Sequence, residues 1–280
     1  MEYKLRKIFN KDKNIIIGAI HFAPLFGYKD FSSYQKVLQN SLEDLSAFEN
    51  GGVDGIIIEN NYDVPHKIIV EKETVEMMMK LGKEIKNKTK LPIGVSVLWN
   101  DYKSALLISK NIGAQFIRVP VFVDSVETNY GKVFADPEAV LKFRKEIGDE
   151  NIALLTDIHV KHSKLLDNKL IEDSAKEAIK RGSDALIVTG KWTGDAPDLS
   201  DLKKVKKIAG NFPILIGSGV DKDNVKELFK YSNGAIVSTS VKEGYAKKGE
   251  TNVKTWEQRI SIEKVRKLVE KICLSLQKMV

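Results

Sequence analysis

Short runs of apolar residues recur along the chain and are separated by longer segments in which apolar residues have helical spacing. Runs that are apolar at almost every position are typical of parallel strands, which are buried on both faces. Eight strands are predicted on this basis, at Ile15–Ile20, Gly55–Ile58, Ile93–Leu98, Phe116–Phe122, Ile152–His159, Ala185–Val188, Pro213–Ile216 and Ala235–Val237.

The intervening segments carry signals for the start and the face of helices. In Phe31–Asn50 the apolar residues form one stripe at helical spacing. Asp136 is followed by Pro137, which is the usual order of a capping residue and the first helical position. The other helix predictions are a cap at Asp101, a start at Asp221 before Asn224–Tyr231, and a last helix from about Lys254 to Gln277.

The connections that precede the strands are tight, whereas several that follow them are long. Glycines such as Gly52 and Gly182 stand where a helix would end before the next strand. Short loops at one end and long loops at the other are typical of a barrel with one functional face. We therefore predict an α/β fold, a single (β/α)₈ TIM barrel domain with eight parallel strands over residues 1–280. An open doubly wound sheet is the main alternative, and the unbroken series of eight strand–helix units disfavours it.

The composition indicates in which compartment this barrel occurs and whether it spans a membrane. The chain has 280 residues, 42% of them hydrophobic and 30% charged, as expected of one globular α/β barrel. Its single cysteine, Cys273, excludes an internal disulfide and favours a reducing, cytoplasmic compartment. We expect that side chain to pack in the core. No run of about 18 apolar residues is present, and Met1–Lys13 is charged throughout, so neither a membrane span nor a signal peptide is expected.

The formal net charge of +7 favours an anionic ligand, but it does not by itself identify one. The lysines are spread along the predicted helices and alternate with glutamates, which is typical of a solvated helix exterior. No nucleic acid partner is therefore expected. Barrels of this kind often associate, so we expect a homo-oligomer, by default a symmetric dimer.

Polar residues gather at the carboxyl ends of the predicted strands. A single one there is more often structural, but all four histidines of the chain, His21, His66, His159 and His162, lie at or just after such an end. In the fifth strand, alternation places Asp157, His159 and Lys161 on one face, where each can shift the pKa of the others, as acid–base chemistry requires. The expected catalytic residues are His21, Glu59, Asp157, His159 and Lys161.

A second group of residues predicts a phosphate site. In barrels, the loops after strands seven and eight often bind phosphate through backbone N–H groups at a glycine turn and a short helix. A tight turn with capping hydroxyls is the alternative for these loops, and Trp192 is expected to form a hydrophobic wall or lid nearby. The expected substrate-binding residues are Gly217, Ser218, Gly219, Ser238, Thr239 and Ser240 in these loops, together with Asn60, Asn100, Arg118, Thr189 and Gly190.

A divalent metal held by four of these residues, His21, Glu59, Asp157 and His159, is an alternative arrangement. The sequence lacks an HExxH spacing and a cysteine pair, and Lys161 would repel a cation beside such a site. No metal or other cofactor is therefore predicted.

Several motifs in order along the chain resemble the BtpA family, also called BtpA/SgcQ. The similarity extends from about Ile15 to the last helix. Pro120 stands where the family usually has asparagine, and Lys191-Trp192 replaces smaller residues. The matching motifs are residues 17–25 (IGAIHFAPL), 52–60 (GVDGIIIEN), 94–101 (GVSVLWND), 116–119 (FIRV), 157–162 (DIHVKH), 185–190 (ALIVTG) and 216–220 (IGSGV).

The resemblance implies a phosphate-binding barrel, but it implies no agreed reaction. The family name comes from a role in building or stabilising photosystem I at the thylakoid membrane, and other members are encoded with sugar-uptake and sugar-metabolism genes. We therefore expect an enzyme of isomerase, aldolase or lyase type acting on a small phosphorylated metabolite such as a sugar phosphate. The alternative is a non-catalytic biogenesis or stability factor for a membrane protein complex, with peripheral membrane association.

Overall fold

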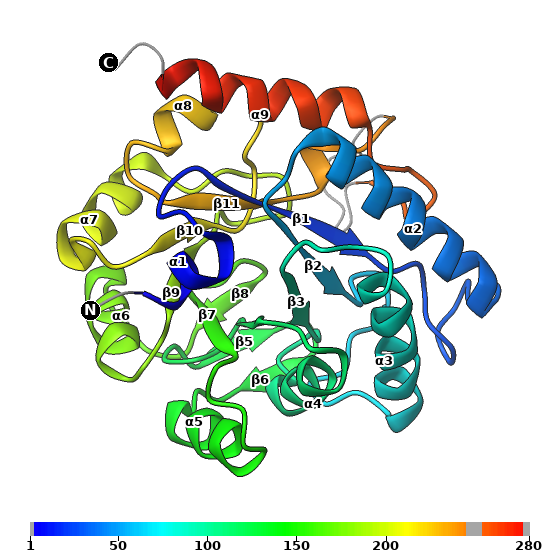
Figure 1. The fold of residues 1–280 in the computed structure, drawn as a ribbon. Helices are drawn as coiled ribbons and strands as arrows, with labels where there is room; N and C mark the ends of the chain where they lie inside the picture. Colours follow the sequence, from blue (N-terminus) through cyan, green and yellow to red (C-terminus); the bar gives the residue numbers. More distant parts are fainter. Residues whose placement is uncertain (1–2, 245–253, 277–280) are drawn as a thin grey trace.

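A computed structural model describes residues 3–244 and 254–276, and it shows a closed barrel of eight parallel strands surrounded by helices (Figure 1). Going round the barrel, the strand order is β1-β11-β10-β9-β7-β4-β3-β2, and β1 pairs with both β2 and β11. This closure confirms the predicted barrel, and the open-sheet alternative is wrong. The barrel strands are β1 (Ile15–His21), β2 (Gly55–Glu59), β3 (Ile93–Ser96), β4 (Phe116–Val119), β7 (Ala153–Ile158), β9 (Ala185–Val188), β10 (Ile214–Ile216) and β11 (Gly234–Val237).

The predicted helix caps at Asp101 and Asp136 are confirmed. Their carboxylates accept hydrogen bonds from the backbone N–H groups of Ser104 (3.0 Å) and Ala139 (2.9 Å). The helices are α1 (Lys4–Phe9), α2 (Tyr34–Gly51), α3 (Lys72–Lys86), α4 (Tyr102–Ile112), α5 (Pro137–Glu146), α6 (Ile171–Lys180), α7 (Leu199–Ala209), α8 (Val225–Leu228) and α9 (Ile262–Leu276), with a 3₁₀ turn, η1, at Thr239–Val241.

Two helix predictions were wrong in their extent. The α8 helix has only four residues, Val225–Leu228, because the chain after it turns with three-residue hydrogen bonds from Lys230 to Glu227 and from Tyr231 to Leu228. The last helix begins at Ile262 rather than near Lys254. Asp44 on α2 accepts the N–H of Ile260, which holds the approach to α9 in a non-helical conformation.

The short helix α1 closes the amino end of the barrel, where Figure 1 shows it lying across the ring of strands. Its buried side chains, Leu5 and Phe9, join the apolar cluster that fills the barrel interior. The Phe9 ring lies 5.7 Å from that of Phe116 on β4. With this end plugged, the carboxyl ends of the strands are the part of the barrel where a ligand can enter.

A second, three-stranded antiparallel sheet lies outside the barrel, within connections that were expected to be loops. Its order is β6-β5-β8, formed by β5 (Val126–Thr128), β6 (Gly131–Val133) and β8 (Ser163–Leu165). Val126 and Val133 of this sheet form a small apolar core with Trp99 and Val160. The sheet therefore ties together the segments that follow β3, β4 and β7.

Across 3–244 and 254–276, none of the helices is both long and apolar enough to cross a membrane. The side chain of Cys273 and the residue Gln277 lie outside the described part of the chain.

Candidate active site

The fifth barrel strand ends earlier than the sequence predicted. The β7 strand stops at Ile158, and His159 and His162 have left-handed backbone conformations, with φ of 49° and 60°. The N–H of His159 donates to Asp124 and that of Lys161 donates to the Thr189 hydroxyl, so the chain turns here. The expected strand alternation after Asp157 was therefore wrong.

This turn separates the predicted catalytic residues. Lys161 and His162 line a cavity at the carboxyl end of the barrel, whereas His159 is not among the residues that line it. The Nε2 atom of His159 is buried and has no hydrogen-bond partner in the described chain. Asp157 lies beneath the cavity with its side chain fully buried.

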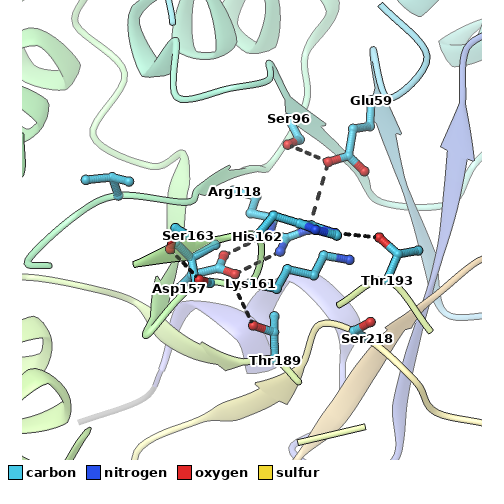
Figure 2. A network of polar contacts seen from close by, with 12 residues as sticks. Glu59, Ser96, Arg118, Asp157, Lys161, His162, Ser163, Thr189, Thr193 and Ser218 are labelled. Atoms are coloured by element: carbon cyan, nitrogen blue, oxygen red, sulfur yellow. Dashed lines mark hydrogen bonds and ion pairs between the residues drawn. The ribbon is translucent and has the colours of Figure 1, made fainter. Parts of the chain in front are cut away.

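Arg118 on β4 lies between two carboxylates inside the barrel mouth (Figure 2). Its Nε and Nη2 atoms donate to the two oxygens of Asp157, both at 2.8 Å, and its Nη1 lies 3.9 Å from Oε1 of Glu59. Glu59 also accepts the Ser96 hydroxyl at 3.2 Å. Paired charges of this kind compensate for burial, and they fix the guanidinium at the floor of the cavity.

His21 and Glu59, at the ends of neighbouring strands, form the second ionisable pair. The two residues are partners in the β1–β2 register, and His21 Nε2 lies 3.3 Å from Glu59 Oε2. Burial lowers the pKa of His21, which favours its neutral form. Burial alone would raise the pKa of Glu59, but His21 and the charges of Arg118 and Lys161 together lower it to about 2.

Lys161 is a buried amine at this end of the cavity. Burial and the nearby positive charge of Arg118 lower the pKa of its amine to about 8, against the opposing effect of Glu59. In Figure 2 its side chain runs toward the side of the site where Thr193 lies. At pH 7 about a tenth of such amines are uncharged, which makes a lysine usable as a base or a nucleophile.

The cavity has a volume of about 770 Å³ and brings together most of the predicted site residues. Asn60 and Asn100 do not line it; their side chains accept the N–H groups of Leu98 (2.7 Å) and Val121 (2.8 Å) and so shape the loops. Asp157, His159, Thr189 and Gly190 are likewise absent from the lining. The predicted residues that line it are His21, Glu59, Arg118, Lys161, Gly217, Ser218, Gly219, Ser238, Thr239 and Ser240.

The loops after β10 and β11 form a rim in which several hydrogen-bond donors have no partner among residues 3–244 and 254–276. Gly219 has a φ of +69°, and a Cβ there would lie 2.0 Å from the backbone nitrogen of Ala196, so only glycine fits. The hydroxyl of Ser238 is buried without a partner within the described residues. The N–H groups of Thr239 and Ser240, at the start of η1, also have no acceptor among the described residues. We call the loops 217–219 and 238–240 the glycine–serine rim.

Sequence reasoning missed several residues of this cavity. His66, Trp99, Tyr130 and His162 all line it, and none of them was predicted as a site residue. The position of all four histidines after strand ends was the available signal. Pro120 and Trp192, two residues at which this chain differs from the usual family pattern, also line the cavity.

Comparison with known proteins gives the family. The sequence profile described as the BtpA family matches residues 12–273. The chain belongs to the BtpA family. This confirms the resemblance seen in the sequence motifs.

Relatives in this family cover most of the chain. The photosystem I biogenesis protein BtpA of Synechocystis sp. is 35% identical over 232 residues, which is 82% of this chain and 80% of that protein. An uncharacterized protein of Pyrococcus horikoshii is 36% identical over 257 residues, 91% of this chain and 94% of that one.

Solved structures share the fold at much lower identity. N-(5'-phosphoribosyl)anthranilate isomerase from Pyrococcus furiosus has a TM-score of 0.55 and 16% identity, over 93% of this chain and 99% of that one. Tryptophan synthase of Mycobacterium tuberculosis has a TM-score of 0.61 and 11% identity, over 96% of each chain. At these identities the likeness concerns the barrel fold.

The four residues considered as metal ligands are not grouped together in this BtpA-family barrel. His21 and Glu59 are adjacent, but Asp157 is engaged by Arg118 and His159 lies outside the cavity lining. Among residues 3–244 and 254–276, no three His, Cys, Asp or Glu side chains converge as metal ligands would. The arrangement instead places cationic and acid–base groups beside a rim of hydrogen-bond donors.

Proposed function

We propose that this BtpA-family protein is an enzyme that binds a small phosphorylated metabolite and acts on it by acid–base chemistry of isomerase, lyase or aldolase type. The observation that carries the proposal is one cavity with two complementary parts. Lys161, Arg118 and the His21–Glu59 pair lie in one part, and the glycine–serine rim lies in the other. Binding and chemistry would thus occupy different strands of the same barrel mouth.

The glycine–serine rim is suited to a phosphate. The N–H groups of Thr239 and Ser240, which have no partner among the described residues, would donate to phosphate oxygens together with the Ser238 hydroxyl, and Gly219 lets the backbone approach closely. One solved structure with the same barrel fold is N-(5'-phosphoribosyl)anthranilate isomerase, whose name indicates a phosphorylated substrate. That supports the proposal as an analogy of fold.

The acid–base groups are proposed to be Lys161 and His21. Lys161 would remove or return a proton, or attack a carbonyl as the neutral amine. His21, neutral and next to ionised Glu59, would exchange a proton with the substrate, and Arg118 would stabilise a developing oxyanion. Asp157, expected to act directly, would instead be a positioning residue for Arg118.

Binding of inorganic phosphate and ribose 5-phosphate, measured by calorimetry, tests the proposal. The wild-type protein should bind both, and Ser238→Ala should weaken both because it removes a donor from the rim. Ser240→Ala is a matched control for loss of a rim hydroxyl, since Ser240 already donates to the carbonyl of Val220. If neither anion binds, or if Ser238→Ala leaves both affinities unchanged, the phosphate site is wrong.

A second candidate function rests on the name of one relative. The Synechocystis protein is called a photosystem I biogenesis protein, and it matches 82% of this chain. Under this alternative the present chain would associate peripherally with a membrane complex. Cell fractionation and light scattering of the purified protein test this alternative, together with the predicted cytoplasmic location and dimer. Recovery with membranes through a salt wash would favour the alternative.

A further inference from the structure

We propose that the aromatic part of the cavity is a subsite for a planar, nitrogen-bearing ring, so that the substrate is a nucleotide-like phosphorylated compound. This inference rests on the proposed phosphate site and adds a second recognition element to it. In the strand order of the barrel, β10 and β11 stand opposite β3 and β4. The glycine–serine rim therefore faces the loops that carry Trp99 and Tyr130, whereas Trp192 follows the neighbouring strand β9 and lies beside the rim, with its carbonyl 3.4 Å from the Ser218 hydroxyl.

The aromatic side chains of the cavity form two ring pairs. His66 and Tyr130 meet edge to face with centroids 5.3 Å apart, and His162 and Trp192 do so at the same distance. Trp99 adds a fifth ring to the lining. We call these five residues, His66, Trp99, Tyr130, His162 and Trp192, the aromatic subsite. Aromatic faces bind planar rings by stacking over their whole face, an interaction that a phosphate group cannot make.

His66 supplies a polar atom that has no other use within the described chain. Its side chain is 7% exposed, and its Nδ1 atom is buried without a hydrogen-bond partner there. Burial lowers the pKa of His66 to about 4, so the ring is neutral at pH 7 and can offer either a donor or an acceptor. A buried polar atom left unpaired costs free energy, and the edge of a heteroaromatic ring would pair it.

The size of the cavity and the exposure of Trp192 point to the same kind of ligand. Pockets of roughly 300–1,000 Å³ enclose drug-sized ligands, and a cavity of about 770 Å³ is large for a lone sugar phosphate. The Trp192 side chain is 59% exposed at the mouth, although it lies against His162. A ring bound there would cover this apolar surface.

Two rings of the aromatic subsite, Trp99 and Tyr130, are packed against an apolar core. Trp99 packs with Val126, Val133 and Val160 in the small core beneath the accessory sheet, and Tyr130 packs against this core from the turn between β5 and β6. This explains why a sheet is built into connections that the barrel itself does not need. A fixed ring geometry lowers the entropic cost of binding a rigid planar ligand.

The test compares AMP, ribose 5-phosphate and adenosine by calorimetry, with tryptophan emission as a second readout. AMP should bind about ten-fold or more tightly than ribose 5-phosphate, because stacking on aromatic side chains adds to the phosphate contacts. AMP should also quench the emission of Trp99 and Trp192, and ribose 5-phosphate should not. His66→Ala and Tyr130→Leu should each weaken AMP about ten-fold and leave ribose 5-phosphate unchanged, which also shows that the variants are folded.

Phe134→Leu is the matched control. Phe134 follows β6 in the same hairpin region, is 70% exposed and does not line the cavity, so this change should leave all affinities unaltered. Equal binding of AMP and ribose 5-phosphate, unaffected by Tyr130→Leu, would overturn the ring subsite and leave the phosphate site standing. Equal binding of adenosine and AMP, unaffected by Ser238→Ala, would overturn the phosphate site and support the ring subsite. Absence of binding by all three compounds would overturn both.

Discussion

Arg118 and Asp157 form a two-pronged ion pair inside the barrel, with Nε–Oδ1 and Nη2–Oδ2 distances of 2.8 Å. The pair joins neighbouring strands β4 and β7 directly under the cavity. The Asp157 side chain is fully buried, and only 7% of the Arg118 side chain is exposed. This arrangement means that Asp157 can shape the site through Arg118 without contacting a ligand.

Replacement of this acid should therefore destabilise the protein. Asp157→Asn leaves Arg118 buried without its closest counter-charge, and breaking a buried pair typically costs about 3–5 kcal/mol in the free energy of unfolding. Urea denaturation measures the change. Glu146→Gln is the control, since Glu146 is exposed and lies 3.8 Å from Lys142, so a loss below about 1 kcal/mol is expected. A loss as small for Asp157→Asn would show that the pair contributes little.

Lys161 should react with amine reagents at a lower pH than surface lysines. With its pKa lowered to about 8 by burial and Arg118, half of its amines are neutral at that pH, whereas an ordinary lysine reaches this point near about 10.4. Acylation followed by peptide mass spectrometry gives the pH midpoint. Lys72, whose side chain is 85% exposed, provides the comparison within the same sample. Identical midpoints for the two lysines would contradict the assignment.

Lys242 should make the stability of the fold depend on pH. Its amine is buried and donates to the Tyr62 hydroxyl at 2.8 Å. Burial lowers its pKa to about 7, with Asp44 opposing and Arg259 reinforcing the shift. Below pH 7 both folded and unfolded chains carry the proton. Between pH 7 and about 10.4 only the unfolded chain does, so the free energy of unfolding rises by about 1.4 kcal/mol per pH unit.

Lys242→Met should remove this contribution. Urea melts between pH 7.5 and 9.5 should show a slope lower than that of the wild type by about 1.4 kcal/mol per pH unit. Lys72→Met, on the exposed face of α3, should leave the slope unchanged. Parallel curves for the wild type and Lys242→Met would mean that Lys242 keeps its charge when the chain folds.

Gly219 and Gly113 allow backbone strain to be separated from steric exclusion. Their φ angles are +69° and +68°, but an added Cβ meets Ala196 backbone at 2.0 Å in the first case and nothing within 4 Å in the second. Gly113→Ala should cost about 1 kcal/mol, the penalty of the left-handed conformation. Gly219→Ala should cost on the order of 3 kcal/mol, since the 195–196 backbone must also shift. Thermal melts measure both, and equal losses would argue against the close approach.

Much of this protein follows from its sequence. Buried parallel strands need continuous apolar runs, so the eight runs located the eight barrel strands, and the caps at Asp101 and Asp136 follow from local hydrogen bonding. The presence of a cavity at the carboxyl ends of the strands also agrees with the sequence, because glycine turns and polar strand ends are local features. His21, Glu59, Arg118 and Lys161 were predicted and do line the cavity.

Tertiary structure decided which side chains face that cavity. The direction of His159 depends on a left-handed turn held by Asp124, and Asp157 is withdrawn by Arg118 from another strand; neither partner is close in sequence. The accessory sheet and the plug of α1 depend likewise on long-range packing. Local pattern predicts the strands because burial on both faces requires a continuous apolar run, and it predicts the caps because their hydrogen bonds are made within three residues. The orientation of a site residue depends instead on partners that only the closed barrel brings within reach.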